Sequence, residues 1–180
     1  MSEAVAIQAL TAEAMTARLE EFCDLLIDCV DGGASVGFMA PLSRQRAREF
    51  WSGIIASLKR GERIVLAATR GSGGAVIGSV QLVLAQADNQ PHHGDVSKML
   101  VHSSARRQGL GALLLAAIET AAIEAGKTLL VLDTVPGTVA DRLYQRAGWT
   151  PIGIIPGFAL MPDGAPCDTR VFWRRVGPGN

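Results

Sequence analysis

Two arginines and two glycines stand in one short segment of the sequence, Arg106-Arg107-Gln108-Gly109-Leu110-Gly111. The segment lies between a strand-like run and a strongly amphipathic helical run, so its glycines fall at a helix N-terminus. Free backbone N–H groups and the helix dipole favour an anion there, and the arginines add positive charge. The sequence therefore predicts a pyrophosphate-binding turn that extends to Ala112.

Two aspartates are candidates for proton transfer or amine binding. Asp133 ends a fully apolar run, 128–133, and we expect burial there to raise the pKa of its carboxyl. A simple N-terminal cap or loop hydrogen bond is the alternative role for Asp133. Asp95 begins the strand-like run 95–102 and is the rival candidate for the role of base. Its carboxylate could instead bind a substrate ammonium.

Ser35 lies in a glycine-flanked pattern, Gly33-Ala-Ser35-Val-Gly37, that matches the nucleophile elbow of serine hydrolases. That motif needs a strand before the serine and a helix directly after it. Here a long amphipathic run precedes the serine and Pro41 follows, so hydrolysis through Ser35 is kept only as an alternative. We expect the segment 33–39 to form the acceptor side of a cleft instead, with Phe38 and Met39 lining a small apolar pocket.

Hydrophobic periodicity and turn signals predict the elements that position these residues. In chain order they are a strand 5–10, a helix of about twenty residues capped by Thr11, a helix from Ser43 to Gly61, strands 63–70 and 75–85, a strand 95–102, a helix 107–125, a strand 128–133, a helix 138–147 and strands 150–155 and 169–176 around the turn 162–164. This order mixes hairpins with crossovers and predicts an α+β fold with a mixed, mostly antiparallel central sheet flanked by helices.

The alternation of the strand 95–102 fails at Met99-Leu100-Val101, where three apolar residues follow one another. Such a break indicates either burial on both faces or a β-bulge. A disrupted strand can offer backbone groups to a ligand arm and to an oxyanion.

Composition limits the class of protein. The 180 residues suit one domain, 1–180, and the 17 basic and 17 acidic side chains leave no excess charge for a nucleic-acid or anionic-membrane partner. No apolar run reaches membrane-spanning length, and the start Met1-Ser2-Glu3 lacks the features of a secretory signal. The three cysteines lack metal-ligand spacing, so we expect free buried thiols, no metal and a cytoplasmic protein.

Two motifs resemble the signatures of the GNAT superfamily of N-acetyltransferases: Arg106-x-x-Gly109-x-Gly111 and Ala140-x-x-Leu143-Tyr144-x-x-x-Gly148-Trp149. The second carries Trp149 where phenylalanine is usual, and Gly137 stands where many members have an asparagine. The resemblance implies that acetyl-coenzyme A (acetyl-CoA) binds at the turn, that residues 99–101 contact its pantetheine arm, and that Tyr144 is the general acid. It also implies that Asp95 could act as a base through water.

A closer resemblance is to the tabtoxin-resistance branch of acetyltransferases. It rests on Gly32–Ala40, Leu132-Asp133-Thr134, and Pro156-Gly157 with Pro162-Asp163-Gly164. The resemblance implies that Asp133 is the base, that 32–40 forms part of the acceptor site, and that the acceptor is a small amine such as a β-lactam amino acid.

We therefore expect acetyl transfer from acetyl-CoA to a primary amine by direct attack in a ternary complex. The alternative from another class is a non-catalytic acyl-CoA-binding module with the same turn. The oligomeric state stays open, with a homodimer through the C-terminal edge strands as one outcome.

Overall fold

The structure, a computed structural model, describes residues 4–71, 73–84 and 86–177. The start Met1-Ser2-Glu3 and Ala85, the expected end of the strand 75–85, lie outside the described residues. Seven strands form one sheet in the order β1-β2-β3-β4-β5-β7-β6. They are β1 (Val5–Ala9), β2 (Arg63–Arg70), β3 (Val76–Val83), β4 (His93–Val101), β5 (Leu129–Thr134), β6 (Thr150–Leu160) and β7 (Pro166–Arg175). Among the described strands, only β4 and β5 pair in parallel, which confirms the mixed, mostly antiparallel sheet.

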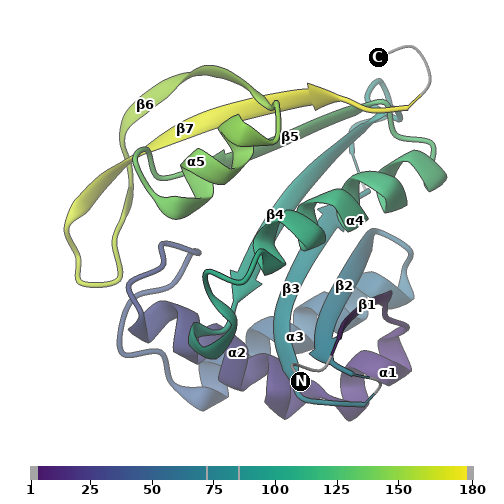
Figure 1. Cartoon of the computed structure of the whole chain (residues 1–180), viewed down its shortest axis with the longest axis vertical. Helices are drawn as coiled ribbons and strands as arrows, with labels where there is room; N and C mark the ends of the chain where they lie inside the picture. Colours follow the sequence, from purple (N-terminus) through teal and green to yellow (C-terminus); the bar gives the residue numbers. More distant parts are fainter. Residues whose placement is uncertain (1–3, 72, 85, 178–180) are drawn as a thin grey trace.

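Helices cover both faces of the sheet (Figure 1). On one face lie α1 (Ala12–Ala17), α2 (Leu19–Asp31) and α3 (Arg44–Lys59), and on the other α4 (Leu110–Glu124) and α5 (Val139–Arg146). Each face has its own apolar core: Phe22 and Trp51 are buried beneath the first group, and Leu114 and Phe172 beneath the second. The main contacts of α2 and α3 with the sheet are to β2, β3 and β4, and Figure 1 shows these helices lying away from β5 and β7.

Two helix boundaries differ from the sequence prediction. The first long helix is divided at Arg18, whose backbone leaves helical geometry and whose side chain bonds Glu21 and the Gly74 carbonyl. The helix expected from Arg107 begins at Leu110, because Gly109 is its N-cap with a left-handed φ of 80°. Residues 106–109 are therefore a turn before the helix rather than its first turn.

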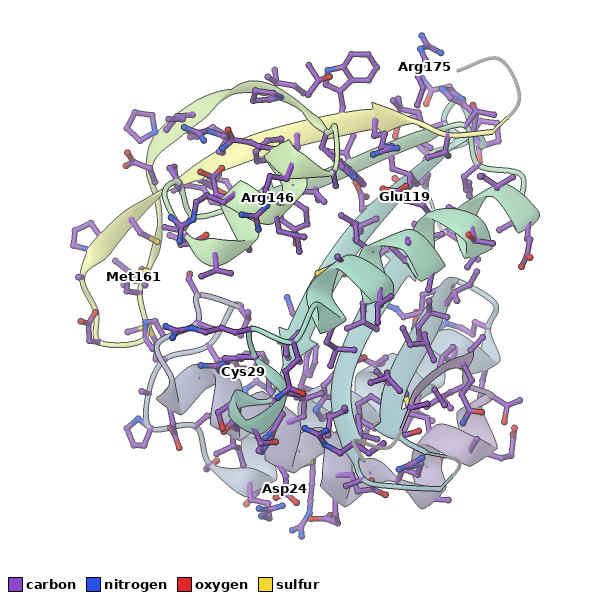
Figure 2. The ribbon with its side chains drawn as sticks, in the orientation of Figure 1. Asp24, Cys29, Glu119, Arg146, Met161 and Arg175 are labelled. Atoms are coloured by element: carbon purple, nitrogen blue, oxygen red, sulfur yellow. The ribbon has the colours of Figure 1, made fainter. Side chains whose placement is uncertain are left out.

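The C-terminal strands are longer than expected and form a single hairpin around Met161–Ala165. Pro151 and Pro156 are tolerated in β6 because it is the outer strand of the sheet. The loop between α2 and α3 reaches this hairpin, where the Ala40 N–H donates to the Pro162 carbonyl at 2.9 Å. Figure 2 labels Met161 at the hairpin tip, next to that loop.

The break expected at Met99-Leu100-Val101 is a β-bulge. The register changes between Ser79↔Leu100 and Gln81↔Ser97, and Lys98 has a φ of 49° at the extra residue. On its other side β4 pairs with β5 only from His93 to Asp95. From Val96 onward the edge of β4 has no strand partner there, and Figure 1 shows the two strands moving apart.

Candidate active site at the parting of strands β4 and β5

The turn before α4 presents unpaired backbone donors. Within the described residues, no protein acceptor bonds the N–H groups of Arg107, Gln108 or Gly109. The first-turn N–H groups of Leu110 and Gly111 have no intrahelical acceptor either. Five consecutive donors at a positive helix end fit the predicted pyrophosphate site in both geometry and charge.

A carboxylate that the sequence reading missed holds this turn in place. Asp28 on α2 accepts the Ser103 N–H at 2.8 Å and the Ser103 hydroxyl at 2.6 Å. Its carboxylate also lies 3.7 Å from Arg106 Nη2 and 3.7 Å from His102 Nε2. Burial acts to raise the pKa of Asp28, but the Ser103 hydrogen bonds and the neighbouring positive charges outweigh it and lower that pKa. Asp28 therefore stays charged and fixes the turn to α2.

The two predicted arginines differ in their surroundings. Arg106 donates from Nε to the Val101 carbonyl at 3.2 Å, so it joins the end of β4 to the turn. Arg107 is exposed, and no residue in the described part of the chain bonds its guanidinium. Gln108 donates to the Ser104 carbonyl at 3.0 Å. Arg107 is thus the side chain left free to meet an anion at this turn.

Close helix packing explains Gly111. A Cβ at this position would stand 3.1 Å from Leu143 Cδ2 on α5, tighter than most real contacts. The glycine lets α5 approach α4, and α5 carries Tyr144.

Tyr144 lies on the α4/α5 side of the sheet and is only 5% exposed. Its hydroxyl contacts Met99 Sδ, at the bulge, at 3.9 Å. Burial, and then the negative charge of Asp133, raise the pKa of Tyr144 far above its ordinary value. The hydroxyl therefore keeps its proton at any physiological pH, as a general acid must.

The neighbours of Tyr144 fix its position. Asp141, one turn earlier on α5, is buried and accepts two 2.8 Å hydrogen bonds from Arg170 on β7. Trp149 packs its ring 6.2 Å from that of Tyr144 and donates from Nε1 to Glu119 at 2.8 Å. Glu119 is labelled on α4 in Figure 2. Asp141, Arg170 and Glu119 were not singled out from the sequence, because their contacts join segments that are distant in the chain.

A cavity of about 260 Å³ opens on the opposite face, beside the parting of the strands. It is lined by Asp95, Val96, Ser97, Val131, Leu132, Asp133, Ile155, Phe158, Thr169 and Val171. Because Leu132 and Phe172 face the α4/α5 core, Asp133 and its partner Val171 point to the other side. Tyr144 and Asp133 thus approach the same gap from opposite faces.

The expected burial of Asp133 is wrong. Asp133 is exposed, because α2 and α3 pack mainly against β2, β3 and β4 on this face. Asp133 Oδ2 accepts a hydrogen bond from the Thr169 hydroxyl at 2.8 Å. The carboxylate is thus held in place and open to the cavity.

Asp95 faces the same cavity with both oxygens already in contact. Gln86 donates to Oδ2 at 2.7 Å, and His93 Nε2 lies 3.2 Å from Oδ1 without hydrogen-bonding geometry. Lys127 donates to the Leu84 and Pro91 carbonyls and so fixes the ends of the segment that carries Gln86.

The three residues predicted on the acceptor loop lie outside the lining of this cavity. The Ser35 hydroxyl donates to the Leu160 carbonyl at 3.3 Å, and its contacts in the described residues include no histidine or acid that could activate it. Phe38 packs edge-on against Phe50 at 5.1 Å. Met39 is half exposed near Gly164. Ser35 and Met39 instead lie beside the β6–β7 hairpin, and Phe38 packs onto α3.

Among the described residues, no group of three possible ligands could hold a metal ion, and no helix is both long and apolar enough to cross a membrane. The cysteines Cys23, Cys29 and Cys167 are free and buried, as expected.

A model of the acetyltransferase (GNAT) family matches residues 19–149, which include the turn, the bulge and Tyr144. The chain belongs to this family. Solved structures agree with the fold of this acetyltransferase. A protein from Acinetobacter baylyi ADP1 has a TM-score of 0.81 at 17% identity, covering 98% of this chain and 95% of its own.

Two further structures have the same fold. The yncA protein of Salmonella typhimurium, solved with its cofactor acetyl-CoA, has a TM-score of 0.77 at 18% identity, over 98% of this chain and 96% of that one. The ribosomal-protein-alanine N-acetyltransferase of Brucella melitensis has a TM-score of 0.76 at 20% identity, over 95% and 99%. Membership of the family makes acetyl-CoA the donor, and the free N–H groups before α4 fit its pyrophosphate.

Proposed function

We propose that this acetyltransferase acetylates the primary amine of a small molecule by direct attack within a ternary complex. The observation that carries the proposal is the placement of Tyr144 and Asp133 on opposite faces of one gap in the sheet. An acid on one side and a carboxylate on the other match the two proton transfers that such a reaction needs.

Acetyl-CoA, when bound, supplies the thioester carbon that the amine attacks and the sulfur that leaves. The unpaired β4 edge from Val96 to Val101 offers backbone N–H groups to the pantetheine arm and to the carbonyl oxygen as it gains negative charge. Tyr144 gives its hydroxyl proton to the departing sulfur.

Asp133 is the proposed base, because it is anchored by Thr169 and open to the cavity. It accepts the proton that the amine loses as the nitrogen–carbon bond forms. Asp95, engaged with Gln86, holds the incoming acceptor as its ammonium form. That ammonium loses its first proton to water in the open cavity before the neutral amine attacks, and the proton taken by Asp133 is the second. Asp95 acting through water is the competing assignment.

The size of the cavity supports a small acceptor. Its volume of about 260 Å³ is just below the usual range of ligand pockets, about 300–1,000 Å³, and Ile155, Phe158 and Val171 give it an apolar wall. The segments that resemble the tabtoxin-resistance branch, 32–40 and 162–164, contact each other beside the site through Ala40 and Pro162. This contact supports an acceptor of the β-lactam or amino-acid type.

We also propose that the protein acts in the cytoplasm. Three free buried thiols are typical of proteins that fold under reducing conditions.

The Tyr144→Phe variant tests the proposal against a non-catalytic acyl-CoA-binding module. We expect kcat for thiol release from acetyl-CoA, with an amine panel as acceptors, to fall about 100-fold or more. Stabilisation of the variant by acetyl-CoA in thermal unfolding should persist, since the turn before α4 is untouched. Absence of wild-type turnover with every amine, together with acetyl-CoA stabilisation, would favour the binding module.

A further inference from the structure

Lys98 occupies the bulge on the acceptor side of the sheet. Its ammonium stands 5.9 Å from the centre of the Phe50 ring and 3.6 Å from where a Cβ would lie on Gly37. These contacts place the ammonium where the α2–α3 loop, α3 and β4 meet. Its neighbour Ser97 lines the cavity together with Asp133.

The Lys98 ammonium has no counterion in contact. In the described residues it makes no ion pair and no hydrogen bond, whereas the buried Lys127 donates to two carbonyls. Burial lowers the pKa of Lys98, while the charge of Asp133 acts to raise it and that of Arg63 to lower it. The cation–π contact with Phe50 offsets part of the cost of burying this ammonium, but its N–H donors still lack an acceptor, which points to a ligand as their partner.

The backbone gives no reason for a lysine at this position. A φ of 49° favours glycine or asparagine, so the long cationic side chain adds strain rather than relieving it. The residue type is therefore better explained by what its ammonium binds than by the bulge itself.

We propose that Lys98 binds a carboxylate of the acceptor, so that the acceptor is an α-amino acid or a close analogue. The inference rests on the proposed acetyl transfer and deepens it. Ser97, next to Lys98, lines the cavity together with Asp95 and Asp133, so Asp95 and Lys98 would hold opposite ends of one zwitterion. The amine then faces Asp133 at the parting of the strands, and the carboxylate turns toward Lys98 and Phe50.

The Lys98→Asn variant tests this role without endangering the fold, because asparagine tolerates the positive φ better than lysine does. Acceptors are a panel of L-α-amino acids, each paired with its carboxamide, which keeps the amine and removes the anion. We expect kcat/KM of the variant to fall about tenfold or more for the acids and to change little for the amides. Lys98→Arg should keep part of the preference for the acids, since it restores the cation.

Equal losses on acids and amides, or no loss on either, would overturn the role of Lys98, while turnover of the amides would still uphold acetyl transfer. If neither series is acetylated while another primary amine is, the role of Lys98 is overturned and acetyl transfer stands. If no primary amine is acetylated, the proposed function fails, and calorimetry with the same amino acids and coenzyme A decides the role of Lys98. Binding to the wild type that Lys98→Asn abolishes would support the carboxylate site. Equal binding to both proteins, or binding to neither, would contradict it.

Discussion

The two side chains proposed for proton transfer, Tyr144 and Asp133, have opposite environments. Tyr144 is buried between α5 and the sheet, where loss of hydration keeps its proton bound. Asp133 is exposed on the other face and restrained by a single hydrogen bond from Thr169. The contrast is consistent with the proposed roles, because burial keeps the Tyr144 proton in place until it is transferred, and access lets Asp133 meet a cationic amine.

Substitution of the two cavity aspartates separates their roles. We expect Asp133→Asn to lower kcat about 100-fold or more, with unchanged stabilisation by acetyl-CoA. Asp95→Asn should chiefly raise the KM of the amine, because this carboxylate is already bonded by Gln86. Steady-state kinetics at fixed pH provide the measurement. A large loss of kcat in Asp95→Asn with none in Asp133→Asn would make Asp95 the base.

At the residue scale, local patterns were informative where the role depends on the neighbouring backbone. The glycine turn before α4 and the break at Met99-Leu100-Val101 were both found in this way. The exposure of Asp133 could not be found, because it depends on which helices cover β5. Asp28 was missed because its partner Ser103 lies 75 residues away.

The two ends of α4 offer a matched pair of glycines. Gly109 at its start and Gly126 after its end have φ of 80° and 73°, and no atom lies within 4 Å of a Cβ at either position. We expect Gly109→Glu and Gly126→Glu to lose similar stability, about 1–2 kcal/mol. Only Gly109→Glu should lose stabilisation by acetyl-CoA, because its carboxylate repels the pyrophosphate. Thermal unfolding with and without acetyl-CoA measures both effects, and retained stabilisation in Gly109→Glu would contradict the site.

The link between α2 and the cofactor turn depends on pH. Since the folded-state pKa of Asp28 is lowered, its stabilisation is complete above the ordinary carboxyl pKa of about 3.9 and is lost as the pH falls through the lowered value. We expect Asp28→Asn to cost about 1–3 kcal/mol at neutral pH and to weaken acetyl-CoA binding. The cost, followed by denaturant unfolding, should shrink below about pH 4. Asp31→Asn, on an exposed residue of α2, is the control, and an equal loss there would argue against the link.

Elements were easier to predict than their ends. Amphipathic spacing and the capping residues Thr11 and Ser43 located the helices, and both caps form. The helix break at Arg18 depends on a hydrogen bond to the Gly74 carbonyl, which no local pattern contains. The hairpin β6–β7 was predicted too short because β6, as an edge strand, has little of the buried alternation that identifies a strand.

At the scale of the whole molecule, the outer strand β6 carries a row of exposed apolar side chains: Ile152, Ile154, Ile155, Phe158 and Leu160. A long unpaired edge of this kind favours pairing with a second copy. We expect a homodimer in sedimentation experiments, and Ile154→Lys should shift it toward monomer. Val139→Lys, on the exposed surface of α5, is the control. A monomeric wild type at micromolar concentration would contradict the expectation.

The parting of β4 and β5 also bears on how substrates would enter this enzyme and how products would leave it. In the proposed complex, the donor would reach the gap from the α4 side. The acceptor would enter over the part of the opposite face that α2 and α3 leave open, so neither would block the path of the other. We therefore expect that the acetylated product could depart while coenzyme A is still bound, and that free coenzyme A could equally depart first. Because each product would then have its own exit from the gap, we expect the affinity of the enzyme for each product to decide the order of release.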